Sequence, residues 1–356
     1  MHILAIDPGS TSTKIGIFRQ SHLIKKTLTH PRKEIEKFKQ IADQYDYRLG
    51  CIQECLVKEG LAEVPFDAVV GRGGLIKPLE GGIYLVNQAM VRDLQAAVGG
   101  QHAANLGGLL ALSFADLHRC HAYVVDPPVI DELWPPARLS GFAEIERRSL
   151  FHALNQKASA RATAEELGIK YESSNLIVVH MGGGITVGAH CGGRVVDVNN
   201  GLSGDGPFSP ERTGGLPLDG VFRLLSEGRY SIAELQEIVS RRGGVYSYLG
   251  TVEMSEVENR IERGEVKARF VLDAMIYQIA KEVGGLAAAL DGKVDAIVLT
   301  GGMAHSQYIT QRLRQKVCFI AQVCIRPGEC EIEALIDGVR RVWDGIEEAK
   351  EYKGDG

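Results

Sequence analysis

Two glycine-rich turns in this sequence carry residue types that can bind phosphate. The first is Gly9-Ser-Thr-Ser-Thr-Lys14, and the second is Gly182-Gly-Gly184 with Thr186, about 170 residues later. Glycine lets backbone amides approach an oxygen atom closely, and hydroxyl and lysine side chains add further donors. One such turn is usually only a tight hairpin, but two at corresponding positions predict a pair of phosphate cradles.

A third glycine pair, Gly301-Gly302, follows an apolar run and precedes a helical segment, an arrangement suited to a nucleoside. The better-known phosphate motifs are absent. No G-x-x-x-x-G-K-[ST] occurs, and the candidates at Gly71, Gly182 and Gly204 lack the last glycine of G-x-G-x-x-G. The sequence therefore supports neither a P-loop NTPase nor a dinucleotide dehydrogenase.

Two arginines stand in loops rich in Gly or Pro. They are Arg72, in Gly71-Arg-Gly-Gly74, and Arg212, after Ser209-Pro-Glu211. An arginine on a charged helix face is usually a solvated surface residue, but an arginine in such a loop is more often functional. A planar guanidinium grips oxyanions bidentately, so both predict binding of carboxylate or phosphoryl groups.

The elements that must position these residues alternate between strands and helices, which predicts an α/β fold. In the first half we expect strands over His2–Ile6, Ile15–Phe18, Ala68–Gly71 and Ala122–Val125, and helices over Pro31–Leu61, Asn87–Val98, Asn105–His118 and Glu144–Leu167. In the second half we expect strands over Asn175–Val179, Val187–His190 and Ala296–Leu299, and helices over Ser306–Gln315 and Glu331–Ala349.

The return of the strand-turn-strand pattern predicts two duplicated domains. We expect an N-terminal domain over 1–149 and a nucleotide-binding domain over 150–335, with a helix of about 336–356 packing back on the first. The tail from Tyr352 is expected to stay solvated.

Composition excludes several classes of partner. The chain has 356 residues, with 40 Lys and Arg against 45 Asp and Glu, a net charge of −5. That balance gives no electrostatic reason to bind nucleic acid or an anionic membrane. No signal peptide or membrane-spanning run is found, so we expect a cytoplasmic protein, with its seven cysteines as reduced thiols.

Several motifs, taken in order, resemble those of the acetokinase family, and within it the butyrate kinases, in the sugar kinase, Hsp70 and actin superfamily. They are Ile6-Asp-Pro-Gly-Ser-Thr-Ser-Thr-Lys14, Val70-Gly-Arg-Gly-Gly74, Val125-Asp-Pro-Pro128, Phe151-His-Ala-Leu-Asn-Gln-Lys157, His180-Met-Gly-Gly-Gly184, Gly206-Pro-Phe-Ser-Pro-Glu-Arg212 and Leu299-Thr-Gly-Gly302.

The resemblance implies two ribonuclease H-like domains facing a central cleft. It implies reversible, direct in-line phosphoryl transfer from ATP with Mg²⁺ to a short-chain carboxylate, giving an acyl phosphate and ADP. Butyrate or a branched acid is the expected acceptor, and a homo-oligomer, at least a dimer, is the expected assembly. Acetate or propionate as the acceptor is the alternative within the family.

The resemblance also implies roles for individual residues. Arg72, Arg212, His152 and Asp126 are the expected catalytic residues, and His152 is expected to bond the phosphoryl oxygens. Arg72, Gly74, His102 and Phe151 are assigned to the carboxylate. The nucleotide and its phosphates are assigned to Asp7, Ser10, Ser12, Lys14, His180, Gly182, Gly183, Gly184, Gly301 and Gly302.

Magnesium is assigned to Asp126 and Glu331, with Glu333 as the alternative to Glu331 and helix N-terminal capping as the competing explanation. Asp7 stands where most family members have Asn, and we expect it either to add a water-mediated contact to magnesium or to place a repulsive charge near the carboxylate substrate. Gly74 replaces a branched residue, and we expect that change to make room for a longer acyl chain. His30 and His118 have no motif around them and are expected at the surface.

Two further functions compete with this interpretation. A sugar kinase of the same superfamily would need an Asp general base for a hydroxyl, whereas a carboxylate acceptor needs none and suits the two arginines. An actin-like or Hsp70-like ATP switch is the non-enzymatic alternative, but the chain has no length for a second peptide-binding domain.

Overall fold

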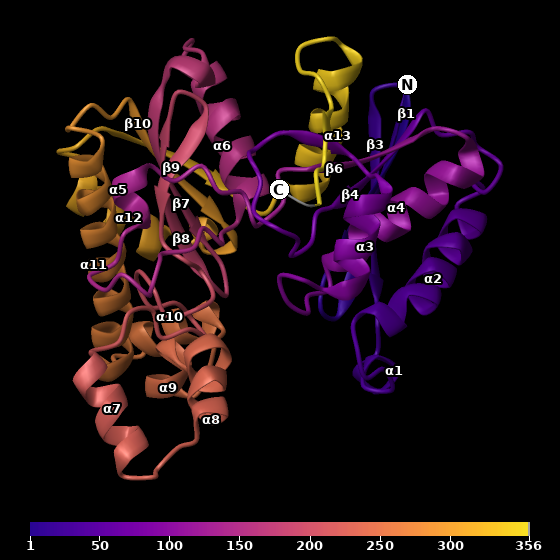
Figure 1. Ribbon diagram of the computed structural model, residues 1–356. Coiled ribbons are helices and arrows are strands. Elements are labelled where there is room, and N and C mark those ends of the chain that lie inside the picture. Colours follow the sequence, from indigo (N-terminus) through magenta and orange to yellow (C-terminus); the bar gives the residue numbers. More distant parts are fainter. Residues whose placement is uncertain (355–356) are drawn as a thin grey trace. The chain divides into compact units, whose positions relative to one another are not determined.

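The computed structural model describes residues 1–354 (Figure 1), and they form two compact units. Unit 1 contains Met1–Ile130 together with the segment from Cys330 onward, and unit 2 is Asp131–Glu329. This division differs in position from the domain limits expected at 149 and 335. The limits of independently folding domains remain a prediction.

Unit 1 is built on one sheet, with strand order β12-β5-β6-β4-β1-β2-β3. The first three strands form an antiparallel meander, whereas β1, β4 and β6 are parallel neighbours. The strands are β1 (His2–Pro8), β2 (Ser12–Arg19), β3 (His22–Thr29), β4 (Ala68–Arg72), β5 (Ile83–Leu85), β6 (His121–Val125) and β12 (Lys350–Glu351).

Helices cover both faces of this sheet. Gly71 of β4 faces α4, where a Cβ would lie 2.0 Å from the carbonyl oxygen of Gly107. Val125 of β6, one register position beyond the partner of Gly71, faces α13 at Gly338. The helices of this unit are α1 (Arg32–Ile35), α2 (Tyr45–Lys58), α3 (Gln88–Ala96), α4 (Asn105–His118) and α13 (Glu331–Trp343).

Unit 2 repeats the arrangement, with strand order β11-β10-β7-β8-β9. Again three antiparallel strands are followed by parallel ones beside the first of them. The strands are β7 (Asn175–Met181), β8 (Ile185–Cys191), β9 (Arg194–Val198), β10 (Ala296–Gly301) and β11 (Gln322–Pro327). The α/β prediction with two related sheets is confirmed.

Alternate residues of β7 enter two separate cores of unit 2. Ile177 and Val179 pack in the larger core with α11, and Leu176 and Val178 pack with α6. The helices are α5 (Pro135–Arg138), α6 (Ala153–Glu166), α7 (Leu218–Ser226), α8 (Ile232–Glu237), α9 (Gly244–Leu249), α10 (Met254–Glu262), α11 (Val266–Ala289) and α12 (Gln307–Val317).

Several expectations about local structure are wrong. The helix expected over Pro31–Leu61 is interrupted by turns and bends, and the one expected from Glu144 begins only at Ala153. His30 is buried, because β3 ends against α2 and its ring bonds Thr13. Tyr352 is also buried rather than solvated, since its hydroxyl donates to Asp93 at 2.6 Å.

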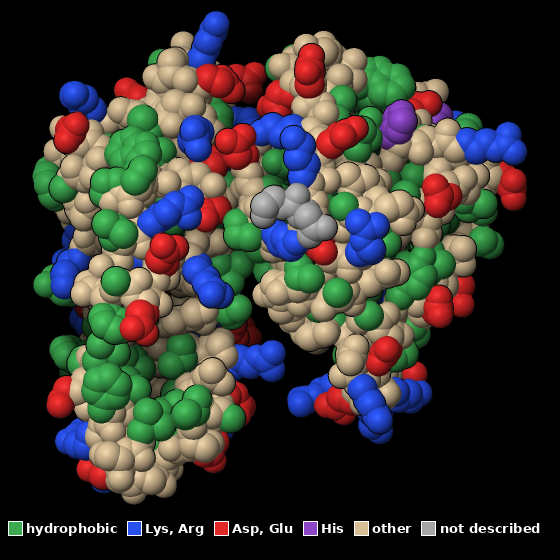
Figure 2. All heavy atoms as spheres, in the orientation of Figure 1, with side chains coloured by type: hydrophobic (Ala, Val, Ile, Leu, Met, Phe, Trp, Pro, Cys, Tyr) green, Lys and Arg blue, Asp and Glu red, His purple; other side chains and the backbone are tan. Residues whose placement is uncertain are grey.

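Exposed apolar side chains gather over the α7–α9 segment of unit 2 (Figure 2). They include Leu218, Phe222, Ile232, Tyr246 and Tyr248. Within residues 1–354, no helix is long and apolar enough to cross a membrane.

Candidate functional site

Three residues assigned to the reaction follow neighbouring parallel strands of unit 1. Asp7 lies near the end of β1, Arg72 ends β4, and Asp126 follows β6. The register pairs Ile6 with Gly71 and Arg72 with Val125, so the three residues share the carboxyl edge of the sheet. Ligands of open α/β sheets bind at this edge.

Arg72 is the centre of a charge cluster at this edge. Its Nη1 lies 3.1 Å from Oδ1 of Asp7 and 3.2 Å from Oε1 of Glu331. Lys14 contacts the other oxygen of Glu331, at 3.4 Å. The structure therefore brings four of the assigned residues together. The negative charge of Asp7 is balanced by Arg72 rather than left facing an anionic substrate.

The two glutamates considered for magnesium have different surroundings. Glu331 is buried within the cluster at the first turn of α13, whereas Glu333 is half-exposed and bonds Lys25 at 2.7 Å. Asp126 is buried in a left-handed conformation with φ of 38°, and its Oδ1 accepts from the amide of Gly82 at 2.8 Å. Of the three carboxylates considered for magnesium, Asp126 and Glu331 are therefore the buried ones.

The turn between β1 and β2 carries Ser10, which is exposed, and Ser12, which is half-buried. Beneath it lies Arg48, a fully buried residue that the sequence analysis did not identify. Its guanidinium donates to the carbonyl of Ser12 at 3.1 Å and to Oγ1 of Thr13 at 3.0 Å. Arg48 thus fixes the turn from below.

His30 completes this support, and its expected surface position is corrected here. Its Nε2 lies 2.8 Å from Oγ1 of Thr13. Oγ1 of Thr13 therefore bonds both His30 and Arg48, and the guanidinium of Arg48 is the donor in the second bond. Burial, with a smaller contribution from the nearby charge of Arg48, lowers the pKa of His30 to about 4. The ring is therefore neutral near pH 7.

The space beside Gly74 is filled, which contradicts the expected room for a longer acyl chain. A Cβ at this position would lie 2.4 Å from Oδ1 of Asn105 and 2.8 Å from Cδ2 of Leu94. Asn105 also accepts from the amide of Leu75 at 2.8 Å. Glycine is needed here because the start of α4 and the side of α3 pack directly against the backbone.

The two remaining residues assigned to the carboxylate belong to different units. His102 belongs to unit 1, is exposed, and accepts from the amide of Ala104 at 3.1 Å through Nδ1. Phe151 is buried in unit 2, immediately before α6. Its side chain is 4% exposed.

The assigned residues of unit 2 also gather at the carboxyl edge of its sheet. Thr300 of β10 pairs with His180 of β7, and Gly301 pairs with Pro327 of β11. The Gly182–Gly184 turn follows β7, and its first amide bonds the carbonyl of Gly184 at 3.0 Å. The turn therefore lies next to the glycines that follow β10.

Arg212 crosses this turn. A Cβ on Gly184 would lie 2.0 Å from Nη1 of Arg212, so only glycine leaves room for the guanidinium. The same nitrogen donates to the carbonyl of Gly201. The Nε of Arg212 is buried and has no hydrogen-bond partner among the residues that the structure describes. Burial lowers the pKa of Arg212, and Glu211, whose Oε1 lies 3.6 Å from Nη2, offsets only part of that effect.

Two assigned histidines stack beside the turn. The rings of His152 and His180 are parallel, with centroids 3.9 Å apart and planes 12° from each other. His152 lies 3.0 Å from Oγ1 of Thr186 through Nδ1, and His180 lies 2.7 Å from Oδ1 of Asn155. Thr186 is fully buried, so it supports His152 instead of joining the phosphate cradle expected from the sequence.

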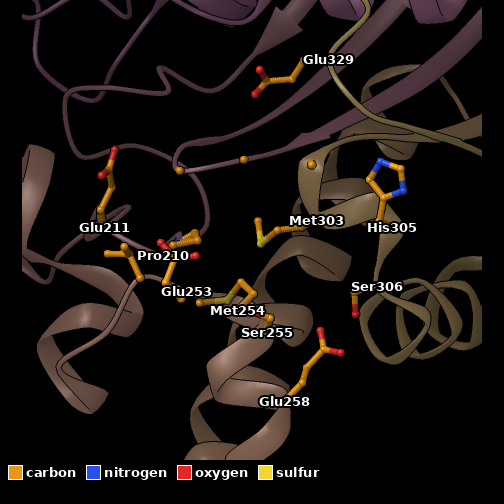
Figure 3. Close-up of a pocket in the computed structure, with 14 residues that line it drawn as sticks. Pro210, Glu211, Glu253, Met254, Ser255, Glu258, Met303, His305, Ser306 and Glu329 are labelled. Carbon is orange, nitrogen blue, oxygen red and sulfur yellow. The ribbon is translucent and has the colours of Figure 1, made fainter. Parts of the chain in front are cut away.

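A cavity of about 580 Å³ opens at the same edge of unit 2. Its wall includes Gly182, Gly183 and Gly302, three of the glycines assigned to the nucleotide. Figure 3 shows Met254 and Met303 in the middle of the lining, with acidic side chains around them. The sequence analysis missed 252–258 because this stretch contains no glycine or phosphate-binding motif.

Among residues 1–354, no group of three His, Cys, Asp or Glu side chains is arranged to hold a metal ion unaided. A magnesium ion that bridges nucleotide phosphates needs only one or two protein carboxylates, because phosphate oxygens and water complete its shell. The buried carboxylates of Asp126 and Glu331 fit that more modest requirement.

Solved structures with the same fold include two acetate kinases and a propionate kinase. The chain matches acetate kinase from Porphyromonas gingivalis with a TM-score of 0.79 and 19% identity, over 95% of this chain and 99% of the other. It matches acetate kinase from Entamoeba histolytica with a TM-score of 0.73 and 17% identity, over 96% of this chain and 99% of the other. It matches a propionate kinase from Francisella tularensis subsp. tularensis SCHU S4 with a TM-score of 0.70 and 17% identity, over 94% of this chain and 98% of the other.

The model of the acetokinase family matches residues 143–322, just over half of the 356 residues. The chain belongs to the acetokinase family.

Proposed function

We propose that this protein transfers the γ-phosphoryl group of ATP to the carboxylate of a short-chain acid, reversibly, to give an acyl phosphate and ADP. Membership of the acetokinase family supports a carboxylate-phosphorylating kinase. The observation that carries the proposal is the buried Nε of Arg212, which has no partner among the described residues and lies beside the Gly182–Gly184 turn. A phosphoryl oxygen would supply the acceptor that this one nitrogen lacks.

The nucleoside is assigned to the cavity of unit 2. Its volume of about 580 Å³ lies within the usual range for small-molecule sites. Val252, Met254 and Met303 offer apolar contacts for a base, and the carboxylates of Glu211 and Glu258 can accept from ribose hydroxyls. The phosphates would extend toward Gly182, with Gly301 and Gly302 at the end of β10.

Residues of unit 1 are proposed to bind the acceptor and the metal. The guanidinium of Arg72 would hold the carboxylate of the acceptor. Asp7 and Glu331 orient this guanidinium through their ion pairs with it. Asp126 and Glu331 would hold magnesium through its waters. The bound ion would neutralise phosphate charge, which together with positioning is most of what phosphoryl transfer requires. Lys14 and the β1–β2 turn add donors for phosphate oxygens.

We propose butyrate or a branched short-chain acid as the acceptor, with acetate or propionate as the alternative. The support for butyrate is the series of sequence motifs. Gly74 does not add support for a longer acyl chain, because Asn105 and Leu94 fill the adjacent space. A homodimer and a cytoplasmic location remain predictions, and the exposed apolar side chains over α7–α9 offer a surface suited to self-association.

Hydroxamate trapping tests the proposal. The protein is incubated with MgATP, hydroxylamine and a ladder of acids from acetate to valerate, including isobutyrate. We expect acyl hydroxamate with a maximum at butyrate or isobutyrate. A maximum at acetate or propionate would reject the butyrate class but keep the carboxylate kinase. No product with any acid, despite measurable ATP binding, would reject the kinase itself.

Two further assays separate the competing functions. ADP formation with sugars, and none with acids, would support a sugar kinase, and ATP hydrolysis without any phosphorylated product would support an ATP switch. Arg212→Ala should abolish trapping, whereas Arg229→Ala, at a side chain 66% exposed, should leave it unchanged.

A further inference from the structure

A chain of hydrogen bonds runs through the interior of unit 2 and ends at His152. The Tyr171 hydroxyl lies 2.8 Å from Nδ1 of His190, and Nε2 of His190 lies 3.1 Å from Oε1 of Gln156. Nε2 of Gln156 lies 2.8 Å from Oγ1 of Thr186, which in turn lies 3.0 Å from Nδ1 of His152. Gln156, Thr186 and His190 are fully buried, so no solvent interrupts the chain.

The direction of this chain is fixed at one point by a backbone carbonyl. Nε2 of Gln156 lies 3.1 Å from the carbonyl oxygen of Thr186, which can only accept. The amide nitrogen of Gln156 must therefore face Thr186, and its oxygen must face His190. The amide packs closely against β8, because a Cβ at Gly188 would lie 2.4 Å from Oε1 of Gln156.

The protons on either side follow from that anchor. Burial, with the charges of Lys157 and Arg161, lowers the pKa of His190 well below its ordinary value, so the ring is neutral. His190 donates from Nε2 to Gln156, which leaves Nδ1 to accept from Tyr171.

On the other side, Oγ1 of Thr186 accepts from Gln156. In the described part of the chain, the acceptor within reach of the Thr186 hydroxyl proton is Nδ1 of His152. Nδ1 of neutral His152 must therefore be unprotonated.

We infer that Gln156 and Thr186 fix the tautomer of His152, so that the neutral ring carries its proton on Nε2. The role of that proton rests on the proposed function: Nε2–H would donate to an oxygen of the transferring phosphoryl group. The tautomer itself does not depend on it. The opposite tautomer would turn a lone pair toward an anionic oxygen. Gln156 and Thr186 are positioning residues, because they act through His152.

The stacked partner has the opposite arrangement. Nδ1 of His180 lies 2.7 Å from Oδ1 of Asn155, and Nδ2 of Asn155 donates to the carbonyl of Gly328 at 3.5 Å. Since the amide nitrogen of Asn155 faces that carbonyl, its oxygen accepts from His180. In the neutral form His180 is therefore protonated on Nδ1. The two parallel rings provide an internal comparison within one spectrum.

The test is long-range ¹H–¹⁵N NMR of the full-length protein, labelled with ¹⁵N in its ten histidines, at a pH above their titration. His152→Gln and His180→Gln assign the two rings. We expect Nε2 of His152 and Nδ1 of His180 to resonate as protonated nitrogens. A wild-type spectrum with the proton on Nδ1 of His152 overturns the inference, whatever the enzyme's activity.

Variants separate tautomer control from simple packing. Thr186→Val keeps the shape but removes the hydroxyl, and should give mixed tautomers at His152 and about a ten-fold fall in kcat with KM for ATP little changed. Thr186→Ser should restore both. Tyr171→Phe, at the far end of the same chain, should leave the His152 signals unchanged, because the chain is anchored at the Thr186 carbonyl.

Two outcomes would contradict the control of the His152 tautomer by Thr186. If Thr186→Val leaves the His152 signals as in the wild type, Thr186 does not control the tautomer. If Tyr171→Phe shifts them as much as Thr186→Val does, the anchor is not at Thr186. An absence of acyl hydroxamate from the wild type would instead reject the proposed function while the NMR result stands by itself.

Discussion

The guanidinium of Arg212 occupies the space in which a side chain on Gly184 would stand, 2.0 Å from the position of its Cβ. Gly184→Ala must therefore displace Arg212 or the turn. We expect kcat/KM to fall about 100-fold, the order of losing one charged transition-state contact. Steady-state kinetics with the best acid of the ladder measures this.

Gly285→Ala is the matched control for that variant. Gly285 lies in α11, where nothing stands within 4 Å of an added Cβ, so the substitution should leave kinetics unchanged and stabilise the helix slightly. Wild-type kcat/KM in Gly184→Ala would show that the position of Arg212 over the turn is not needed for the reaction.

Arg72 has two effects that substitutions can separate. Arg72→Ala removes the cation that contacts both Asp7 and Glu331, so we expect a loss of activity and a loss of about 1–3 kcal/mol in the free energy of unfolding. Arg72→Lys keeps the charge but not the bidentate fork. It should recover much of the stability while kcat/KM stays at least about ten-fold below wild type.

Urea denaturation and kinetics on the same samples check both effects. Lys25→Ala is the control. It removes a surface ion pair to Glu333, which lies on α13 together with Glu331, and should lower the free energy of unfolding by less than about 0.5 kcal/mol. Full activity in Arg72→Lys would contradict bidentate binding of the carboxylate by Arg72.

Strand ends and glycine turns could be predicted from the sequence because their signals are local. Apolar β-branched runs that end in Asp7, Arg72 and Asp126 indicate strands whose carboxyl ends carry chemistry, and the structure aligns them at one edge. Arg48 could not be found in this way. An arginine among polar helix residues looks solvated until the tertiary fold buries it beneath the β1–β2 turn.

Packing against distant elements explains the other differences. Gly74 suggested an open pocket because the sequence does not reveal that Asn105 and Leu94 fill the space. Similarly, a helix was expected to begin at Glu144, but Arg147 instead bonds the carbonyl of Ala137 and Asp197 of β9 in a segment that is not helical.

Gly74→Ala should destabilise the protein without changing its choice of acid. The added methyl would meet Asn105 at 2.4 Å, and forcing such contacts in a packed interior costs about 1–3 kcal/mol. Thermal denaturation measures the loss, and the hydroxamate ladder measures the ratio of butyrate to acetate turnover. A shift of that ratio toward acetate, with unchanged stability, would instead restore the acyl-pocket role of Gly74.

His30 should make stability depend on pH in the acidic range. Burial lowers its pKa from 6.5 to about 4, so between these values the unfolded chain binds a proton that the folded protein does not. The free energy of unfolding must therefore fall as the pH decreases from about 6.5 toward 4, with a slope from this one group of at most about 1.4 kcal/mol per pH unit.

His30→Gln removes the titrating imidazole while keeping a polar side chain near Thr13. Because His190 has a lowered pKa in both proteins, its contribution cancels when the two are compared. Urea denaturation at pH 7.5 and pH 5 should show that the wild type loses more stability than His30→Gln over the same interval. Parallel losses in the two proteins would mean that His30 titrates in the folded state much as it does in the unfolded chain, and that its bond to Thr13 does not depend on a neutral ring.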